Sequence, residues 1–319
     1  MNQLLHTPTA EDIRATHEAI RPMIHRTPVL TCESINKMAG AKLFFKCENF
    51  QKVGAFKMRG AASAALRLSD KEKERGLATH SSGNHAQAVA LSARLLGIPA
   101  YIVMPDTSPA IKKAATEGYG AEVILCENTL AARERTLKEV VKRTGATFIH
   151  PYNDYNVIAG QATAAKELLE DTEALDCIIA PVGGGGLMSG TALSARYFSP
   201  GTLAYGSEPK AVDDAYRSFK SGTLQENTTI DTIADGLRTN LGEKTFDIIQ
   251  RELEDVFTVS EEAIIAAMRL VWERMKIVIE PSCAVPLAAV LANRPVFEGK
   301  KVGVILTGGN VDLGNLPFY

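Results

Sequence analysis

Short apolar runs alternate with alanine-rich amphipathic segments along most of this chain. Apolar runs bounded by turn residues are typical of buried parallel strands, and the segments between them have the periodicity of crossover helices. We therefore expect an α/β fold built on parallel sheet. The predicted strands lie at 42–48, at the end of 76–82, and at 100–105, 122–126, 148–151, 177–183, 203–208 and 301–309.

Two of the predicted helices, at 86–97 and 128–145, have clear C-terminal ends. Each segment finishes on a glycine, Gly97 in the first and Gly145 in the second. Glycine suits the position just after a helix because it adopts a left-handed backbone without a steric cost. We expect these two glycines to be C-caps.

The length of the chain predicts two lobes. It has 319 residues, and single hydrophobic cores stop growing near roughly 250–300 residues. The strand and helix pairs between 76 and 149 are compact enough to form a smaller lobe inserted into a larger one. We expect a large domain of residues 1–75 and 150–319 and a small, mobile domain of residues 76–149.

Composition favours small-molecule chemistry. Charged residues make up 23% of the chain and the net charge is -2, so no strong field attracts nucleic acid or an anionic membrane. No apolar run approaches the ~20 residues that span a bilayer, and the first twenty residues lack a basic segment followed by an apolar one. We expect a cytoplasmic protein with neither a nucleic acid nor a membrane as partner.

The cysteines are odd in number, widely spaced and without a CxxC pair. This distribution argues against a disulfide framework and against a zinc cluster, so we expect reduced thiols in the core. The five are Cys32, Cys47, Cys126, Cys177 and Cys283.

A lysine stands in an unusual setting in the segment FQKVGAFKMRG, residues 50–60. Lys57 lies between Phe56 and Met58, just before the small residues AASAAL. A solvated lysine usually belongs to a polar run, whereas apolar neighbours can desolvate an amine. Lys57 is therefore a candidate for chemistry.

The glycine tract PVGGGGLMSG, residues 181–190, follows a predicted strand and opens a predicted helix. Backbone N–H groups at such a point can hold an anion, most often a phosphate. The tract is not a Walker A loop, because no GK[ST] follows, and its spacing does not match GxGxxG. The alternative is a tight turn without a ligand, although four consecutive glycines carry a large entropic cost.

Two more strand ends carry polar groups. In SSGNHAQA, residues 81–88, Asn84 can offer an amide to a ligand, while Ser81 or Ser82 can simply cap the following helix. In TGGN, residues 307–310, the Thr307 hydroxyl can face a ring nitrogen, or the segment can be an ordinary turn. Ligands of open α/β sheets bind beyond the carboxyl ends of strands, where these segments lie.

A lysine after an aromatic residue, a glycine turn for phosphate and a hydroxyl at a strand end together meet the needs of pyridoxal 5'-phosphate. The chain resembles the fold-type II pyridoxal-phosphate enzymes, and among them the serine racemase and serine/threonine dehydratase family, which includes 3-hydroxyaspartate dehydratases. This resemblance implies a tryptophan synthase beta-like fold with two open, twisted, mostly parallel sheets. It spans nearly the whole chain through NFQKVGAFKMRGA, SSGNHAQA, HPYNDYNVIAGQ, PVGGGGLMSG, SEP, IADG, WERMKIVIEPS and TGGNVD.

The resemblance implies roles for the cofactor residues. Lys57 would form the Schiff base, Phe56 would pack beside the cofactor, and Asn84 would hydrogen-bond the ring hydroxyl. Thr307 would face the pyridine nitrogen, with a hydroxyl where many relatives have serine. The phosphate would be held by Gly183, Gly184, Gly185, Gly186 and Leu187.

A metal site is also implied by the resemblance. In metal-dependent members a glutamate, a backbone carbonyl four residues on and an aspartate two further bind Mg²⁺ or Ca²⁺, and Mn²⁺ is a third option. In YGSEPKAVDDAYR, residues 205–217, these positions are Glu208, Val212 and Asp214. Oxygen ligands suit a hard cation. Composition alone favours a surface acidic turn instead.

Ser82 bears on the type of reaction. Racemisation needs a proton donor and acceptor on each face of the planar carbanion, and the resemblance places Lys57 on one face and Ser82 on the other. The same carbanion can expel a β-hydroxyl, which leads to a keto acid and ammonia. A pyridine nitrogen facing the neutral Thr307 is expected to be unprotonated, which favours concerted loss of the leaving group.

Substrate recognition is assigned to a loop and an arginine. The substrate carboxylate would meet backbone N–H groups of the loop Ser81, Ser82, Gly83, Asn84 and His85. Arg133 aligns with an active-site arginine of serine racemases and is the candidate for a distal carboxylate, as in 3-hydroxyaspartate; otherwise it is a solvated helix residue. His85 and His150 are further candidate carboxylate contacts, although a single histidine at a strand end is more often structural.

These observations predict a pyridoxal-phosphate-dependent lyase that converts L-serine, L-threonine or 3-hydroxyaspartate to a keto acid and ammonia, with serine racemisation as a second activity. The alternatives are a serine or aspartate racemase with dehydration as a side reaction, and a cofactor-binding protein without turnover. The resemblance further implies a homodimer whose small domain closes over an amino-acid substrate.

Overall fold

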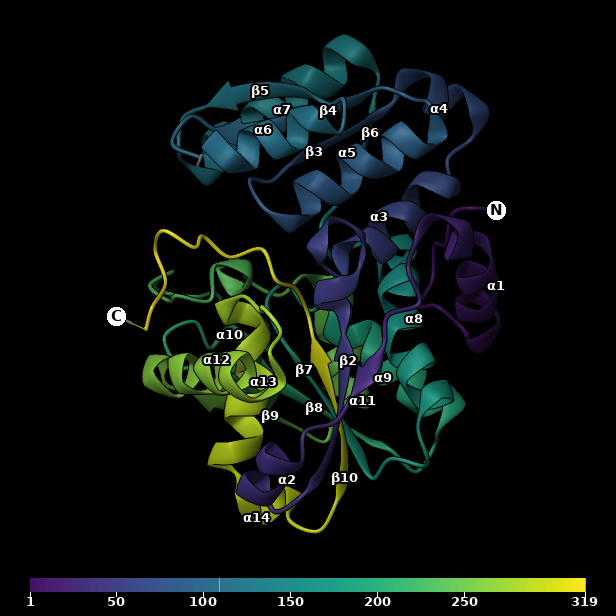
Figure 1. Cartoon of the computed structure of the whole chain (residues 1–319). Coiled ribbons are helices and arrows are strands. Elements are labelled where there is room, and N and C mark those ends of the chain that lie inside the picture. The colour runs from purple at the N-terminus through teal and green to yellow at the C-terminus, as the bar shows by residue number, and fades with distance from the viewer. Residues whose placement is uncertain (109, 319) are drawn as a thin grey trace.

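Two sheets form the framework of the computed structural model, which describes residues 1–108 and 110–318. The larger sheet has six strands, and every neighbouring pair is parallel except the antiparallel pair at the β1 edge. Figure 1 shows this sheet in the lower half of the molecule. Its strands, in spatial order, are β1 (Val29–Leu30), β2 (Lys42–Cys47), β10 (Lys301–Leu306), β7 (Cys177–Pro181), β8 (Leu203–Pro209) and β9 (Asp255–Val259).

The smaller sheet has four parallel strands and lies in the upper half of Figure 1. In spatial order they are β5 (Glu122–Cys126), β4 (Ala100–Pro105), β3 (Leu77–His80) and β6 (Thr147–Phe148). The helices between them are α5 (Asn84–Leu96), α6 (Ala110–Gly118) and α7 (Leu130–Thr144). The predicted α/β class with two mostly parallel sheets is confirmed.

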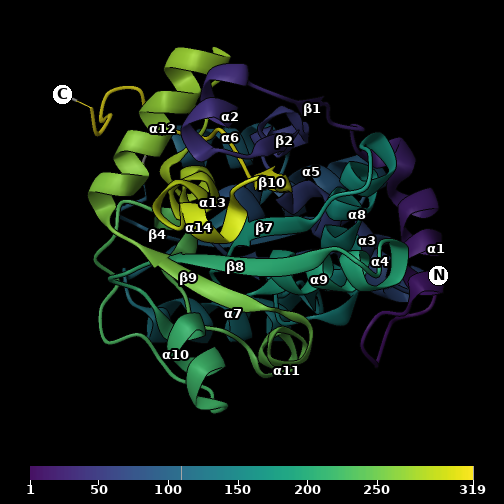
Figure 2. The same cartoon turned by 90° about the horizontal axis from the view of Figure 1, so that it is seen from below.

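Helices cover both faces of the six-stranded sheet, as Figures 1 and 2 show. The helices of this part are α1 (Ala10–Ile20), α2 (Glu33–Ala39), α3 (Lys57–Leu66), α4 (Asp70–Arg75), α8 (Tyr155–Asp171), α9 (Gly186–Phe198), α10 (Asp214–Ser221), α11 (Glu243–Glu252), α12 (Glu261–Met275), α13 (Pro281–Ala292) and α14 (Arg294–Phe297). Alternate residues of one strand point to opposite faces, so Leu43 and Phe45 pack toward α2, α12 and α13 while Phe44 packs toward α8 and α9. Short 3-10 turns lie at Arg21–Met23, Glu48–Phe50, Lys52–Gly54 and Asp235–Leu237.

Most predicted elements appear with small shifts at their ends. The predicted C-caps are confirmed, since Gly97 and Gly145 follow α5 and α7 with φ values of 67° and 73°. The predicted strand at 148–151 is shorter, because the chain leaves the sheet after Ile149 donates to Ala78. Pro151 has no N–H group with which to continue the ladder.

Two edge strands were not predicted. The strand β1 has two residues, and β9 carries the sequence DVFTV, in which polar and apolar residues mix. Edge strands are exposed on one side and therefore lack the continuous apolar run of a central parallel strand. They are recognised by their hydrogen bonds to the neighbouring strands, β2 and β8, and not by their own pattern of apolar residues.

Two general expectations concern the cysteines and the membrane. All five cysteines are free, but only Cys47, Cys177 and Cys283 are buried. Cys32 and Cys126 are partly exposed, so the prediction of core thiols is wrong for these two.

None of the described helices combines the length and the apolar character needed to cross a bilayer.

Candidate active site

Lys57 is the first residue of α3, at the junction between the two sheets. Its Nζ donates to the carbonyl oxygen of Pro151 at 2.9 Å and lies 5.2 Å from the centre of the Phe56 ring. Desolvation lowers the pKa of this amine to about 8, although the negative charge of Glu280 opposes the shift. Lys57 is therefore partly unprotonated near neutral pH, in line with the desolvation expected from its apolar neighbours.

A buried ion cluster fixes the start of α3. Arg59 Nε lies 2.7 Å from Glu48 Oε2, and its Nη2 lies 2.7 Å from Glu167 Oε2. Lys46 Nζ reaches the same Glu167 oxygen at 2.7 Å, and all four side chains are at most 1% exposed. Buried charges persist only when paired. The cluster therefore holds the backbone two residues beyond Lys57 in one position.

The glycine turn joins β7 to α9 and leaves the start of this helix open. Gly185 is the N-cap with φ 83°, and no side chain caps the helix. Among the described residues, no acceptor is found for the backbone N–H groups of Gly186, Leu187 and Met188. Such a helix start binds anions through its free donors and its dipole.

Tyr152 explains why this turn has no side chains. A Cβ on Gly184 would lie 2.2 Å from the Tyr152 ring, and one on Gly186 would lie 3.0 Å from Tyr152 Cα. A Cβ on Gly183 would lie 3.1 Å from Leu237 Cα. Any Cβ at Gly184 would displace the Tyr152 ring, so the glycines are required by packing as well as by backbone conformation.

The start of α5 is open in the same way. Gly83 is its N-cap and no side chain caps the helix, while Ser81 Oγ accepts from the N–H of Gly83 at 3.3 Å. The interpretation of Ser81 or Ser82 as a helix cap is therefore wrong. Among the described residues, the Ser82 hydroxyl has no hydrogen-bond partner and stays available.

Asn84 is oriented by two residues from the opposite sheet. Its Nδ2 donates to Glu280 Oε1 and Oε2 at 2.9 and 3.2 Å, and its Oδ1 accepts from Asn310 Nδ2 at 2.8 Å. When one N–H is shared between the two oxygens of the Glu280 carboxylate, the second N–H of Asn84 is left for a ligand. This arrangement suits a donor to a ring oxygen.

Glu280 is a functional candidate that the sequence did not reveal. It is 4% exposed, its backbone N–H donates to Gly308 at 3.0 Å, and burial, followed by repulsion from Asp235, raises its pKa to about 7. The motif WERMKIVIEPS contains it, but nothing local indicates that its carboxylate meets Asn84 from another lobe. A perturbed carboxyl beside Lys57 is a sign of a functional site.

Thr307 lies beside Lys57 at the end of β10. Its carbonyl accepts from the Phe56 N–H at 3.0 Å, and Gly308 forms a β-bridge with Ala55. The Thr307 hydroxyl is buried and has no hydrogen-bond partner among the described residues. A buried unpaired hydroxyl is costly, so it points to a missing ligand atom.

Three histidines surround the cleft beside Lys57, and burial lowers the pKa of each. His85 has a pKa of about 3; its Nε2 bonds the carbonyl of Ile149 at 3.0 Å, and its buried Nδ1 has no partner among the described residues. An unprotonated Nδ1 repels a carboxylate, so His85 offers only its backbone N–H. His150 has a pKa of about 4, and His80 stacks on Phe148.

Arg133 stands in the first turn of α7, near this cleft. Its Nε bonds the carbonyl of Thr129 at 3.4 Å, within its own helix. Its positive charge is close enough to lower the pKa of His80, although burial is the larger cause. The structure thus brings Arg133 to the His80 side of the small sheet.

Two buried carboxylates lie behind the glycine turn. Glu208 and Asp214 are both 0% exposed. Burial, and then the mutual repulsion of the pair, raises the pKa of Glu208, while burial raises that of Asp214 to about 6. Asp214 Oδ2 accepts from the N–H of Leu241 at 2.7 Å, and the Leu241 side chain packs at the Gly185 position.

This pair fits a hard cation when a backbone carbonyl completes the set. Val212 lies between the two acids in the chain and is 1% exposed. Among the described residues no group of three or more His, Cys, Asp and Glu side chains is arranged for a metal ion. The predicted set has only two carboxylates, so it would depend on carbonyl oxygen and water.

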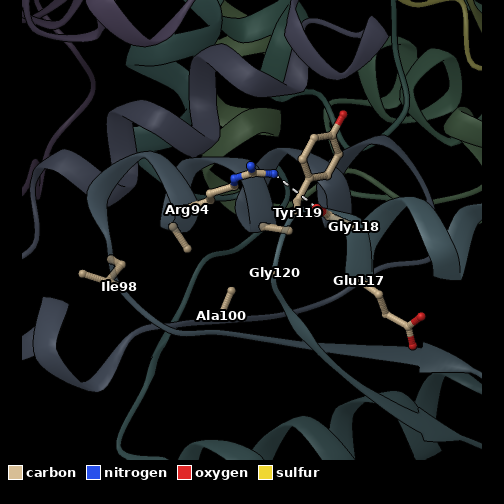
Figure 3. A pocket seen from close by; sticks show the side chains of 9 residues that line it. Arg94, Ile98, Ala100, Glu117, Gly118, Tyr119 and Gly120 are labelled. Atoms are coloured by element: carbon tan, nitrogen blue, oxygen red, sulfur yellow. Dashed lines mark hydrogen bonds between the residues drawn. The ribbon is translucent and has the colours of Figure 1, made fainter.

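The separate predictions converge on one place. Lys57 donates to the carbonyl of Pro151, and the next residue, Tyr152, packs its ring against the glycine turn. Thr307 accepts from the N–H of Phe56 beside Lys57. Its neighbour Gly308 accepts from the N–H of Glu280, whose carboxylate binds Asn84. Figure 3 shows a separate cavity of about 300 Å³ in the small lobe, where Arg94 donates to the Gly118 carbonyl. None of the candidate site residues lines this cavity.

The residues present fit pyridoxal phosphate. The open helix start would hold the phosphate, the partly neutral amine of Lys57 would join the aldehyde, and the Thr307 hydroxyl would face the ring nitrogen. Asn84 would donate to the ring hydroxyl. The helix start and the Thr307 hydroxyl lack another partner among the described residues, which is the expected state of a cofactor site.

Comparisons with known proteins support this fit. The pyridoxal-phosphate dependent enzyme family matches residues 20–308. The chain is 48% identical to a beta-hydroxyaspartate dehydratase of Paracoccus denitrificans over 98% of this chain and 100% of that protein. It is 48% identical to an L-threo-3-hydroxyaspartate ammonia-lyase of Saccharomyces cerevisiae over 96% of this chain and 94% of that one. The crystal structure of a serine racemase from Dictyostelium discoideum superposes with a TM-score of 0.92 at 48% identity, covering 97% and 100% of the two chains.

Proposed function

This chain belongs to the pyridoxal-phosphate dependent enzymes, and we propose that it is an ammonia-lyase acting on β-hydroxy amino acids, with racemisation of serine as a second activity. The observation that carries the proposal is the partly neutral, half-buried amine of Lys57 between the glycine turn and the unpaired Thr307 hydroxyl. The activities named for its relatives, dehydration of hydroxyaspartate and racemisation of serine, agree with such a site.

When bound, pyridoxal phosphate supplies an aldehyde that joins amines and a conjugated ring that stabilises negative charge on the substrate α-carbon. Lys57 would hold the cofactor covalently, and its amine, when free, would accept the substrate α-proton on one face. Phe56 packs beside this amine, and Asn84 donates to the ring hydroxyl. The phosphate is held by Gly183, Gly184, Gly185, Gly186 and Leu187.

The substrate carboxylate binds at the open start of α5. Within the Ser81–His85 loop, the N–H of Ser81 donates to the Val103 carbonyl and that of Gly83 to Ser81 Oγ, while no side chain caps the helix. The N–H groups of Ser82, Asn84 and His85 are therefore the ones proposed to bind the anion. This fixes the α-carbon between Lys57 and Ser82. Lys57 then removes the α-proton, the β-hydroxyl leaves with a proton, and addition of water releases a keto acid and ammonia.

Racemisation is the second candidate function, and the unpaired hydroxyl of Ser82 favours it. For inversion, Lys57 removes the proton from one face of the α-carbon and Ser82 returns one to the other. Elimination needs Lys57 but not a donor on the second face. Ser82 therefore divides the two activities, whereas Lys57 serves both.

Glu208, Asp214 and the carbonyl of Val212 form the proposed site for Mg²⁺, Ca²⁺ or Mn²⁺. A cation would relieve the repulsion between two buried acids whose pKa values are raised. Because Asp214 binds the Leu241 backbone and Leu241 packs against Gly185, the ion would stiffen the glycine turn from behind. Its effect would be structural rather than on the reacting atoms.

Residues 76–149 form the proposed mobile domain, which closes over the substrate and excludes water. Beside the apolar packing of α3 on α5, two polar contacts join this segment to the rest of the chain and would hold it over the substrate. Asn84 binds Glu280, and Lys112 Nζ lies 3.2 Å from Asp235 Oδ2. We also propose a homodimer in the cytoplasm.

Two variants test the proposed function. Lys57→Ala should lose the near-ultraviolet to visible absorption of the bound cofactor and both activities. Ser82→Ala should lose D-serine formation while ammonia release from L-serine, L-threonine and threo-3-hydroxyaspartate continues. Normal keto-acid production by Lys57→Ala would refute the assignment of the amine. An equal loss of both activities in Ser82→Ala would refute the assigned role of Ser82, and an absorbing protein without turnover on any of these substrates would favour a non-catalytic role.

A further inference from the structure

His150 stands just after β6, and its ring is held in one tautomer. Its Nδ1 accepts from the backbone N–H groups of Tyr152 at 3.2 Å and Asn153 at 2.9 Å. Two donors that converge on one ring nitrogen leave no room for a proton there. The single proton of the neutral ring must therefore be on Nε2, which makes Nε2 a donor.

The surroundings keep this ring neutral and fixed. Burial lowers the pKa of His150 to about 4, and the positive charges of His80, Lys57 and Lys244 act in the same direction. The Phe148 ring lies 5.5 Å away and the Tyr152 ring meets it edge-on at 4.6 Å. His150 therefore keeps the same donor in the same direction across physiological pH.

The Nε2 group is available near Lys57, whose positive charge acts on the His150 ring. It has no hydrogen-bond partner among the described residues, and the side chain is only half-buried. The next residue, Pro151, binds Lys57 Nζ. Because β6 pairs with β3, His150 lies at the same sheet edge as His80, which feels the charge of Arg133.

We propose that His150 is a specificity-determining residue that donates its Nε2–H to the distal carboxylate of a β-hydroxy dicarboxylic amino acid. Arg133, at the same edge of the small sheet, supplies the positive charge for that carboxylate. This inference rests on the proposed function and names the substrate class within it. Serine has no second carboxylate, so its side chain leaves the His150 donor to water.

A neutral donor beside a permanent cation has a physical advantage here. A titrating histidine would lose its charge, and with it part of the affinity, as the pH rises past its pKa. The locked ring of His150 gives the same hydrogen bond at pH 6 and pH 8. A hydrogen bond to a charged acceptor contributes about 1.5–3 kcal/mol, which corresponds to roughly 10- to 150-fold in binding.

His150→Asn separates the donor from the structural role of the ring. The Asn Oδ1 can replace Nδ1 as acceptor for the Tyr152 and Asn153 N–H groups, but no atom of asparagine reaches the Nε2 position. In the holoenzyme we expect the KM for threo-3-hydroxyaspartate to rise roughly 10- to 100-fold, by the same factor at pH 6 and pH 8. The loss in kcat/KM should be at least about tenfold greater for this substrate than for L-serine.

Binding of an unreactive ligand gives a readout apart from turnover. Calorimetry with succinate, a four-carbon dicarboxylate without the amine, should show the same weakening in His150→Asn, while propionate should bind the two proteins equally. His150→Gln can offer an amide N–H near the Nε2 position and should recover part of the succinate affinity despite losing the turn contact.

Unchanged succinate binding in His150→Asn, or equal losses for serine and hydroxyaspartate, would make His150 a turn-stabilising residue only and overturn the inference. If His150→Asn does not fold, weak succinate binding by His150→Gln would overturn it as well. In each case ammonia release by the unmodified enzyme would leave the proposed lyase function standing. Failure of that function would appear instead as no turnover by the unmodified holoenzyme.

Discussion

At the scale of single residues, the site depends on groups whose chemistry is set by their neighbours. Lys57 has a lowered pKa because α3 starts in a dry junction, and Glu280 has a raised pKa because it is buried beside Gly308. Asn84 is oriented only because Glu280 accepts and Asn310 donates. The same three residue types on a surface would have ordinary properties.

The protonation of Glu280 should affect cofactor affinity. Above a pH of about 7 the ionised carboxylate accepts from Asn84 and keeps one Asn84 N–H directed at the ring hydroxyl. Below it, the protonated acid competes as a donor, so affinity should fall with decreasing pH. Glu280→Gln should lower the affinity for pyridoxal phosphate about tenfold at pH 8, the effect of a hydrogen bond near 1.4 kcal/mol, and should flatten the pH dependence.

The measurement is a spectrophotometric titration of the cofactor-free protein between pH 6 and pH 9. Asp235→Asn is the matched control, because Asp235 influences Glu280 by charge alone and binds Lys112. An unchanged slope with pH in Glu280→Gln would mean that another group causes the dependence.

At the scale of elements, the site is made by the starts of helices and the ends of strands. The helices α3, α5 and α9 all begin at the cleft, and α5 and α9 begin without a side-chain cap. Glycine N-caps expose backbone donors that a serine or aspartate cap would use. The loss of capping energy is offset when an anion binds at the same position.

A methyl group in the glycine turn should disturb both anchors of the cofactor. Gly184→Ala would place a Cβ 2.2 Å from the Tyr152 ring, and Tyr152 follows Pro151, which binds Lys57. Overpacking of this kind costs about 1–3 kcal/mol, and cofactor affinity should fall at least about tenfold. Gly201→Ala is the control, because a Cβ there meets nothing within 4 Å.

Thermal unfolding and cofactor titration measure the two effects separately. The glycine turn would not be the phosphate site if Gly184→Ala lost stability but bound pyridoxal phosphate with unchanged affinity.

At the scale of the whole molecule, the candidate site lies where the two lobes meet, and α3 packs on α5 there in a shared apolar core. Asn84 from the small sheet binds Glu280 and Asn310, and Lys112 binds Asp235. Beneath the site, the Arg59 cluster and the Glu208 and Asp214 pair stiffen the large lobe.

The buried acid pair should make stability respond to a divalent cation. Folding raises the pKa of both Glu208 and Asp214. Without a cation, stability therefore falls as the pH rises from their ordinary unfolded pKa values to the raised folded values, which for Asp214 is about 6. Mg²⁺ should therefore raise the unfolding temperature more at pH 8 than at pH 5, and the gain in stability should grow with the logarithm of one plus the ratio of its concentration to its dissociation constant. Asp214→Asn should remove most of this response.

Glu173→Gln is a suitable control, because Glu173 is an exposed acid paired with Lys301. Calorimetry at two pH values with Mg²⁺, Ca²⁺ and Mn²⁺ is the measurement. An equal cation effect in Asp214→Asn and in the unmodified protein would place the ion elsewhere.

The sequence by itself determined the α/β class, the central strands and the C-caps at Gly97 and Gly145. It also determined the local segments that contain Lys57, the glycine turn and Thr307. Each of these features depends on a short run of neighbouring residues. Only the tertiary structure decided which distant groups complete them. The Pro151 carbonyl for Lys57 and the Glu280 carboxylate for Asn84 come from distant segments and have no local pattern. The physical reason is that burial and convergence set pKa values and hydrogen-bond direction, and both arise only when segments far apart in the chain meet.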